Sequence, residues 1–270
     1  MDHYVVLGNP IAHSRSPQIH TLFAAQTGQM LSYTARLVEL SAFAPTLVQL
    51  EREGVKGANV TVPFKQEAWQ LMSALSPRAQ RAGAVNTILW RGEEDRYGDN
   101  TDGVGLVTDL TVNQGITLQG SRILLLGAGG AVRGVMAPLL QQKPALLVVA
   151  NRTPDRARQL ADDFSAEGPV RGCGFAELEG QYFDLIINGT ASGLSGEIPA
   201  LPIRLLEARP AVYDMMYSKE PTPFIAWALA NGAIQACDGL GMLVEQAAEA
   251  FYLWRGVRPA TAPVMVALRA

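Results

Sequence analysis

The sequence predicts an α/β protein made of two units. Short apolar runs of strand length alternate with segments of helical periodicity over all 270 residues, which is typical of parallel sheets covered by helices. This length exceeds what a single hydrophobic core usually serves, so two smaller units are expected. A polar turn at Gln119-Gly120 precedes the apolar run 123–126, where a new α/β unit begins.

The first half is expected to form one unit. Pro17 suits the first turn of a helix, and Pro63 would stop a strand. A Gly-Asp turn is expected near Asp99, and helical spacing follows it. The expected strands are 4–7, 31–37, 58–62 and 85–90, and the expected helices are 16–27, 41–53, 66–75 and 102–113.

The second half repeats the alternation, and two helical stretches end the chain. We expect those last helices to return to the first unit, which gives one domain of residues 1–103 plus 240–270 and another of residues 104–239. The expected strands are 123–126, 146–150, 184–188 and 211–215, with one more ending before Gly239, and the expected helices are 132–140, 154–164, 242–254 and 264–270.

Composition excludes several classes of function. With 48% hydrophobic and 17% charged residues the chain can bury a sizeable core, and no long charge run or Pro/Gly/Ser tract suggests disorder. A net charge of -3 offers no basic field for nucleic acid or anionic membrane. Small molecules are therefore the expected partners.

Neither a metal site nor a membrane segment is predicted. Cys173 and Cys237 lie far apart, and no His or Cys stands at metal-ligand spacing around them. The N-terminus lacks the basic start and longer apolar stretch of a signal peptide, and no apolar run reaches the length of a membrane span. We expect a cytoplasmic protein.

The segment Ile123–Gly134 has the order strand, glycine turn, helix start. Glycines let the backbone approach a pyrophosphate, and free amides at a helix N-terminus favour its charge. The match to the dinucleotide fingerprint is partial, because Val132 stands where a third Gly or Ala is usual and Gly130 is an extra glycine. The segment indicates a nicotinamide dinucleotide site.

The end of the next strand indicates which dinucleotide. An acid is expected there in NAD sites, to bind the ribose hydroxyls. The chain instead has Asn151-Arg152-Thr153, with Arg156 one turn later. Asn and Thr can hydrogen-bond a 2′-phosphate and Arg can pair with it, so NADP is predicted. The alternative is a surface turn with ordinary arginines.

Polar side chains gather at strand ends in the first half, where open α/β sheets bind ligands. Serine hydroxyls and free amides before a helix suit a carboxylate, and the amide, hydroxyl, lysine and carboxylate groups suit several hydroxyls. A small hydroxylated acid is the implied ligand. The segments are 9–17, 59–65, 86–87 and 99–102.

Each of these residues also has a simpler interpretation. Ser16 and Asp102 could be helix N-caps, and Lys65 could be a solvated lysine at a helix start. Asn59 and Asn86 could satisfy backbone groups at strand ends. The two histidines nearby, His13 and His20, lack paired ligand spacing and are expected to be structural, loop or surface groups.

Taken together, these segments resemble shikimate dehydrogenase over essentially the whole chain. The most specific parts are Asn59-Val-Thr61-Val-Pro63-Phe-Lys65, Gly83-Ala-Val-Asn86-Thr and Gly98-Asp-Asn-Thr101-Asp102-Gly103, whose order and spacing match the family. Residues 127–134, 151–153, 213–217 and 239–247 also match.

The resemblance implies a two-domain enzyme that reversibly reduces 3-dehydroshikimate to shikimate with NADPH, in the pathway to aromatic amino acids. It implies that Lys65 and Asp102 form the catalytic pair and that Ser14 and Ser16 hold the substrate carboxylate. The residues that it places around the ring and its hydroxyls are Asn59, Thr61, Asn86, Tyr217 and Gln246.

The resemblance also supplies cofactor contacts. At the phosphates it places Gly127, Gly129, Gly130 and Ala131; at the adenosine end Asn151, Arg152, Thr153 and Arg156; near the nicotinamide Thr190, Met215, Gly239 and Met242. Three positions depart from the family pattern, with Gly189 and Ala191 where Ala and Ser are common and Met216 where Ile is common.

Physical chemistry agrees with the catalytic pair. Hydride addition to a ketone leaves developing charge on oxygen that needs a proton or a nearby cation, and Lys65 can supply both. Asp102 can orient the ammonium and bond a substrate hydroxyl, while the cofactor performs the hydride chemistry.

Two alternatives remain open at this point. One is a paralogue of the same fold that oxidises quinate as well as shikimate, or an aminated analogue, possibly with NAD. The other is a catalytically silent module that senses NADP or a metabolite, which fold alone does not exclude. The sequence does not distinguish a monomer from a homodimer.

Overall fold

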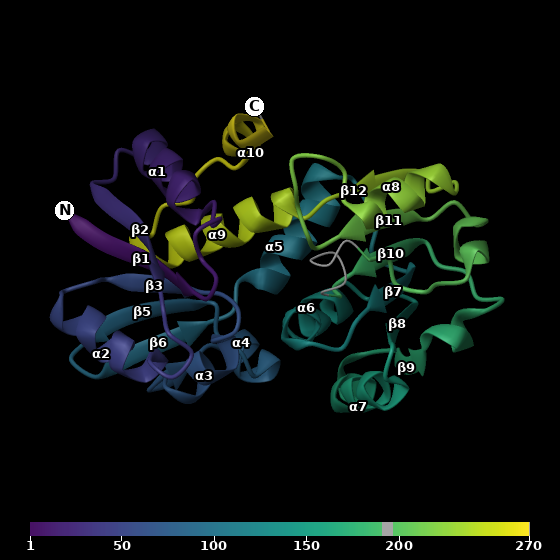
Figure 1. Cartoon of the computed structure of the whole chain (residues 1–270), viewed down its shortest axis with the longest axis horizontal. Coiled ribbons are helices and arrows are strands. Elements are labelled where there is room, and N and C mark those ends of the chain that lie inside the picture. Colours follow the sequence, from purple (N-terminus) through teal and green to yellow (C-terminus); the bar gives the residue numbers. More distant parts are fainter. Residues whose placement is uncertain (191–196, 270) are drawn as a thin grey trace. The chain divides into compact units, whose positions relative to one another are not determined.

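A computed structural model of the chain describes residues 1–190 and 197–269. It divides into two compact units (Figure 1). The first unit is Met1–Gly105 with Val244–Ala270, and the second is Leu106–Leu243. In the described part of the chain no helix is long and apolar enough to cross a membrane.

The sheet of the first unit has six strands in the order β2-β1-β3-β5-β6-β4. All the neighbouring pairs are parallel except those of β5, which is antiparallel to both β3 and β6. The strands are β1 (Asp2–Gly8), β2 (Leu31–Leu37), β3 (Gly57–Val60), β4 (Ala74–Leu75), β5 (Thr87–Gly92) and β6 (Asp95–Asp99).

The reversal of β5 brings polar residues together. Asn59 near the end of β3 pairs with Thr87 at the start of β5, and Thr87 also pairs with Asp99 at the end of β6. Side chains that are far apart in the sequence therefore meet at one edge of the sheet.

Helices cover both faces of this sheet. One face packs Val5, Leu7 and Ile88 against α2 (Phe43–Arg52), α3 (Lys65–Gln70) and α4 (Pro77–Ala82). On the other face, residues such as Tyr4 and Tyr33 meet α1 (Ser16–Thr27) and α9 (Leu240–Arg255) through His20 and Trp254. The last helix, α10 (Ala262–Arg269), contacts α1.

Two expected elements of this unit are wrong. The helix expected over 66–75 ends at Gln70, and residues 74–75 form strand β4 beside β6. The turn expected near Asp99 is instead the end of β6, which forms a hairpin with β5. Gly98 explains the close packing here, because a Cβ on it would lie 2.5 Å from Met72 Cγ and 2.7 Å from Val85 Cγ2. Tertiary packing decides this segment rather than local propensity.

The second unit has a parallel six-stranded sheet in the order β12-β11-β10-β7-β8-β9. Strands β8 and β9 follow β7 on one side of it, and β10, β11 and β12 follow one another on its other side. This is the doubly wound order of dinucleotide-binding folds. The strands are β7 (Arg122–Leu126), β8 (Leu146–Asn151), β9 (Val170–Gly174), β10 (Leu185–Asn188), β11 (Ala211–Asp214) and β12 (Gln235–Cys237).

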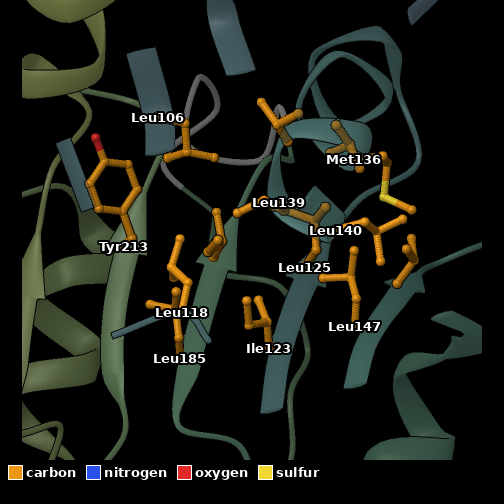
Figure 2. Close-up of a cluster of buried hydrophobic side chains, with 14 of the residues drawn as sticks. Leu106, Leu118, Ile123, Leu125, Met136, Leu139, Leu140, Leu147, Leu185 and Tyr213 are labelled. Carbon is orange, nitrogen blue, oxygen red and sulfur yellow. The ribbon is translucent and has the colours of Figure 1, made fainter. Parts of the chain in front are cut away.

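Both faces of this sheet are buried, because alternate residues of each strand point to opposite sides. Ile123 and Leu125 of β7 pack with α6 (Gly130–Gln141) and α7 (Pro154–Phe164), as Figure 2 shows in part. Leu124 and Leu126 pack on the other face with α8 (Pro223–Ala230). Strand β9 and helix α8 were not expected from the sequence.

Helix α5 (Asp102–Thr108) continues into a π-helical turn, Asp109–Asn113, so the helix expected over 102–113 ends in wider geometry. Such turns occur frequently at functional sites.

Candidate active site

A lysine and an aspartate form an ion pair at the edge of the first unit's sheet. Lys65 begins α3 and Asp102 begins α5, and the Lys65 Nζ lies 2.5 Å from Asp102 Oδ2. The two side chains are 22% and 10% exposed, so the pair is shielded but open to a ligand. The second carboxylate oxygen, Oδ1, accepts a hydrogen bond from Asn86 Nδ2 at 2.8 Å. The carboxylate is held in one orientation, while the ammonium has further protons to donate.

Asn86 is the centre of a hydrogen-bond network around this pair. Its Nδ2 also donates to Thr101 Oγ1 at 2.9 Å, and its Oδ1 accepts from the Thr101 backbone amide at 2.9 Å. Gln246, from α9, places Oε1 3.3 Å from both Asn86 Nδ2 and Thr101 Oγ1. The structure thus brings Lys65, Asp102, Asn86 and Gln246 into one network. Thr101 belongs to it as well, although no separate role was predicted for it.

Asn59 is joined to the same network, but its amide is already occupied. Its Nδ2 donates to the Asn86 carbonyl and to Thr87 Oγ1, each at 3.1 Å. Its Oδ1 accepts from the Tyr33 hydroxyl at 2.6 Å. Tyr33 is a residue that the sequence did not single out; its partner is distant in the chain, and no local signal marks it.

His20 lies next to Tyr33 in the core. Its ring stacks on the Tyr33 ring with centroids 4.2 Å apart and is fully buried. Burial lowers the pKa of His20 to about 3, so the ring is neutral. Its position in the core agrees with the structural role expected for it.

The two serines lie where α1 begins. The Ser16 amide donates to Ser14 Oγ at 3.3 Å. Helix α1 starts at Ser16, and its N-cap is Arg15, which makes no side-chain cap bond. The interpretation of Ser16 as the N-cap is therefore wrong, because Ser16 already lies inside the helix. Pro17 has no amide hydrogen and the Ser16 amide is already bonded to Ser14 Oγ, so the serine hydroxyls are the groups that this helix start offers to an anion.

Thr61 follows β3 in the same unit, beside the end of β1. Its amide donates to the Leu7 carbonyl at 2.9 Å. Gly8 has no side chain there, and a Cβ on it would lie 2.5 Å from Thr61 Cγ2. Among the residues assigned to the substrate, only Tyr217 belongs to the second unit, where it follows β11.

In the second unit, the glycine turn leads from β7 into an open helix start. Gly127 has a φ of 105°, a conformation that favours glycine, and its amide donates to the Ala150 carbonyl at 2.8 Å. Gly129 is the N-cap of α6 and makes no side-chain cap bond. A Cβ on Gly129 or Gly130 would meet no described atom within 4 Å. The turn therefore has both the free amides and the space that a pyrophosphate requires.

Arg152 lines a cavity of about 620 Å³ at the end of β8. Neither Arg152 nor Arg156 forms an ion pair within the part of the chain that the structure describes, and both are exposed. Thr153 is the N-cap of α7 and makes no side-chain cap bond, while Asn151 Nδ2 donates to the Thr153 carbonyl at 3.0 Å. The other residues that line the cavity are Pro154, Gly174, Phe175, Ala176, Glu177, Ala200, Leu201 and Pro202.

The residues assigned to the nicotinamide follow the ends of neighbouring strands. Thr190 Oγ1 donates to Asn188 Oδ1 at 2.7 Å, and Asn188 Nδ2 donates to Asp214 Oδ1 at 3.1 Å. The Met215 amide donates to the Asn188 carbonyl at 2.9 Å. Ala191, named above as a departure from the family pattern, lies outside the described residues.

Family models match most of the chain. Residues 6–88 match the shikimate dehydrogenase substrate binding domain, residues 110–195 match shikimate / quinate 5-dehydrogenase, and residues 239–269 match the shikimate 5'-dehydrogenase C-terminal domain. The chain is 58% identical over 269 residues to the shikimate dehydrogenase (NADP(+)) of Hahella chejuensis, covering 100% of this chain and 99% of that relative. The chain belongs to the shikimate dehydrogenase family.

Another relative and a solved structure are also similar to this chain over its whole length. The shikimate dehydrogenase (NADP(+)) of Alkalilimnicola ehrlichii is 55% identical, with 99% of this chain and 98% of the relative covered. Among solved structures, an Ael1 enzyme from Pseudomonas putida is 43% identical with a TM-score of 0.93, covering 100% of this chain and 99% of the other.

A second solved structure contains ligands. It is the shikimate 5-dehydrogenase of Thermus thermophilus in complex with NADP(H) and shikimate, 36% identical with a TM-score of 0.89 over 100% of this chain and 99% of that one. The family and the α/β fold class predicted from the sequence are confirmed.

Proposed function

We propose that the protein catalyses the reversible reduction of 3-dehydroshikimate to shikimate with NADPH. The observation that carries this proposal is the Lys65–Asp102 ion pair, which Asn86 fixes by a hydrogen bond to the free carboxylate oxygen. The names of the full-length relatives support both the substrate and the cofactor. In this proposal the first unit binds the substrate and the second binds NADP.

The residues of the second unit fit NADP. The uncapped start of α6 at Gly129 and Gly130 would hold the pyrophosphate with backbone amides and the helix dipole. The exposed guanidinium of Arg152 would bind the 2′-phosphate and cover the adenine in the adjoining cavity, with Thr153 and Arg156 nearby. When bound, the cofactor supplies or accepts the hydride.

Lys65 completes the reduction. As the hydride adds to the ketone carbon, the carbonyl π electrons move to oxygen, and Lys65 Nζ donates a proton to that oxygen. In the oxidation of shikimate the same nitrogen takes the hydroxyl proton. Asp102 keeps the ammonium in place and uses its carboxylate to accept a hydrogen bond from a neighbouring substrate hydroxyl. The two groups act as a unit.

The remaining polar groups of the first unit orient the substrate. The hydroxyls of Ser14 and Ser16 would bind the carboxylate, and Thr61, Asn86 and Gln246 would bind ring hydroxyls. Tyr217 of the second unit is assigned to the substrate as well. Asn59 supports this group: its amide donates to the Asn86 carbonyl and to Thr87 Oγ1, and its side-chain carbonyl accepts from Tyr33. It would hold Asn86 and Thr87 in position.

Steady-state rates with shikimate and quinate, each with NADP and NAD, test this function. We expect shikimate with NADP to give the highest kcat/KM. A preference for quinate with NAD would contradict the proposal and favour the paralogue of the same fold. Binding of NADP without turnover of either substrate would favour the silent sensor.

A further inference from the structure

Asp109 is a buried carboxylate that the proposed mechanism does not use. It opens the π-helical turn after α5 and is 0% exposed. Its Oδ2 accepts from the Tyr213 hydroxyl at 2.6 Å, and its Oδ1 accepts from Asn113 Nδ2 at 3.0 Å and Gln114 Nε2 at 3.3 Å. Burying a carboxylate is costly unless several donors satisfy it. Three donors satisfy this carboxylate, so a change at Asp109 would remove an acceptor that all three share.

The carboxylate lies against the first turn of α9. A Cβ on Gly241 would lie 2.0 Å from Asp109 Oδ1, so only glycine fits at that position. One residue later, the Met242 amide donates to the Tyr213 hydroxyl at 3.3 Å. Helix N-termini have free amides and favour negative charge. Asp109 and Tyr213 together hold the start of this helix.

The same turn of α9 is joined to the end of β11. A Cβ on Gly239 would lie 2.3 Å from the Met215 carbonyl oxygen, and the Gly239 amide donates to the Met216 carbonyl at 2.9 Å. Tyr213 lies on β11 two residues before Met215, with its ring in the apolar cluster and its hydroxyl directed away from the labelled leucines (Figure 2). Tyr213 is therefore connected to both segments, to α9 through the bond of its hydroxyl with the Met242 amide and to Met215 along the chain.

The Tyr213 hydroxyl donates one hydrogen bond and accepts another. Burial and the nearby charge of Asp109 raise the pKa of Tyr213, so the phenol stays protonated. Its proton goes to Asp109 and its oxygen accepts from Met242. Only one arrangement of donors and acceptors satisfies all three groups.

We propose that Asp109 is a positioning residue that acts through Tyr213 to fix Met215, Gly239 and Met242 against the nicotinamide. The inference rests on the proposed function, because these three residues are its proposed nicotinamide contacts. All the residues involved belong to the second unit. The adenosine-end residues, such as Arg152, make none of these contacts, so the effect is confined to the nicotinamide end.

The test compares Asp109→Asn and Tyr213→Phe with wild type. We expect each to raise KM for NADP at least about fivefold and to lower kcat about tenfold, because small misplacements of reacting groups cost up to ~100-fold. KM for shikimate and the affinity for adenosine 2′,5′-bisphosphate, which occupies only the adenosine end, should change less than about twofold. The double variant should be no worse than the poorer single variant, since both changes break one connected unit.

Asp184→Asn is the matched control. Asp184 lies in the second unit at the opposite ends of the strands, where its Oδ2 accepts from the Arg122 amide at 2.7 Å. This variant also loses a carboxylate that accepts a backbone hydrogen bond. It should nevertheless leave kcat, the KM values for NADP and shikimate, and the affinity for adenosine 2′,5′-bisphosphate near those of wild type. If Asp109→Asn does not fold, Tyr213→Phe alone decides, because it keeps the ring in the core.

Two results would overturn the inference. One is normal NADP kinetics in Tyr213→Phe. The other is an equal loss of adenosine 2′,5′-bisphosphate binding, which would show a general loosening of the second unit. Wild-type enzyme that fails to oxidise shikimate with NADP would instead refute the proposed function, so the two failures are distinct.

Discussion

Val132 fits beneath the glycine turn because Gly189 has no side chain. A Cβ on Gly189 would lie 2.5 Å from Val132 Cγ2, closer than real Cβ contacts come. In the sequence these are two separate departures, a valine in place of the third glycine and a glycine in place of alanine. In the structure they are linked, since Val132 fills the space that a Cβ on Gly189 would occupy. The imperfect fingerprint is therefore still compatible with a dinucleotide site.

Gly189→Ala should destabilise the protein. The added methyl would force Val132 and Met215 to move, and overpacking of this kind costs about 1–3 kcal/mol. Urea unfolding measures the loss. The control is Val132→Ala, made alone and together with Gly189→Ala. In the double variant the smaller side chain at position 132 should restore part of the stability that Gly189→Ala loses. Strictly additive effects would show that the two side chains are not coupled.

Arg152→Ala should weaken NADP binding selectively. Loss of a charge-assisted hydrogen bond to the 2′-phosphate costs about 1.5–3 kcal/mol, or about 10–100-fold in KM. KM for NAD should rise much less, because NAD loses only the contact of Arg152 with the adenine. Arg158→Ala is the control, because Arg158 lies on the adjoining helix α7 and already pairs with Asp155 and Glu177. Equal losses with NADP and NAD would argue against a 2′-phosphate contact.

His20 should make the protein sensitive to acid. Burial lowers its pKa from 6.5 to about 3 in the folded state, so between these values the unfolded chain binds a proton that the folded chain does not. Above pH 6.5 both states are neutral and the stability is complete. As the pH falls below 6.5, stability should decrease by up to about 1.4 kcal/mol per pH unit. Urea unfolding at a series of pH values measures this decrease for the wild type and for His20→Phe, which keeps an aromatic ring. The free energy of unfolding of His20→Phe should fall less steeply between pH 6.5 and 4. Equal pH dependence of the two proteins would contradict a contribution from His20.

Tyr33→Phe should cost stability without removing a proposed substrate contact. The change leaves the buried Asn59 carbonyl without its 2.6 Å donor, and an unsatisfied buried group costs about 1–3 kcal/mol. Because Asn59 holds Asn86 and Thr87, KM for shikimate should also rise, whereas KM for NADP should not. Thermal unfolding together with the two KM values checks both parts. Unchanged stability would show that the hydroxyl is replaceable by solvent.

Local patterns in the sequence predicted most of the fold. The β2 strand, the glycine turn at Gly127 and helix α7 could be predicted because their periodicity and turn residues lie within a few positions of each other. Strands β4 and β6 could not, because they depend on each other and on the space beside Gly98. Short strands of this kind carry little signal of their own.

The sequence indicated which residues belong to the candidate site but not which of them contact one another. Lys65, Asp102 and Asn86 stand in recognisable segments, and the structure joins them directly. The partner of Asn59 is 26 positions away, and that of Asp109 is 104 positions away. Contacts over such distances depend on strand order and register, which one sequence does not display. For that reason the sequence indicated the reacting residues Lys65 and Asp102 but not supporting residues such as Tyr33 and Asp109.

In the proposed reaction Lys65 transfers the proton. The most direct measurement is kcat of Lys65→Ala with shikimate and NADP, alongside NADP binding by the same variant. We expect kcat to fall at least about a hundredfold, the scale for losing a proton-transfer group, with NADP affinity unchanged. Turnover close to wild type in that variant would contradict it.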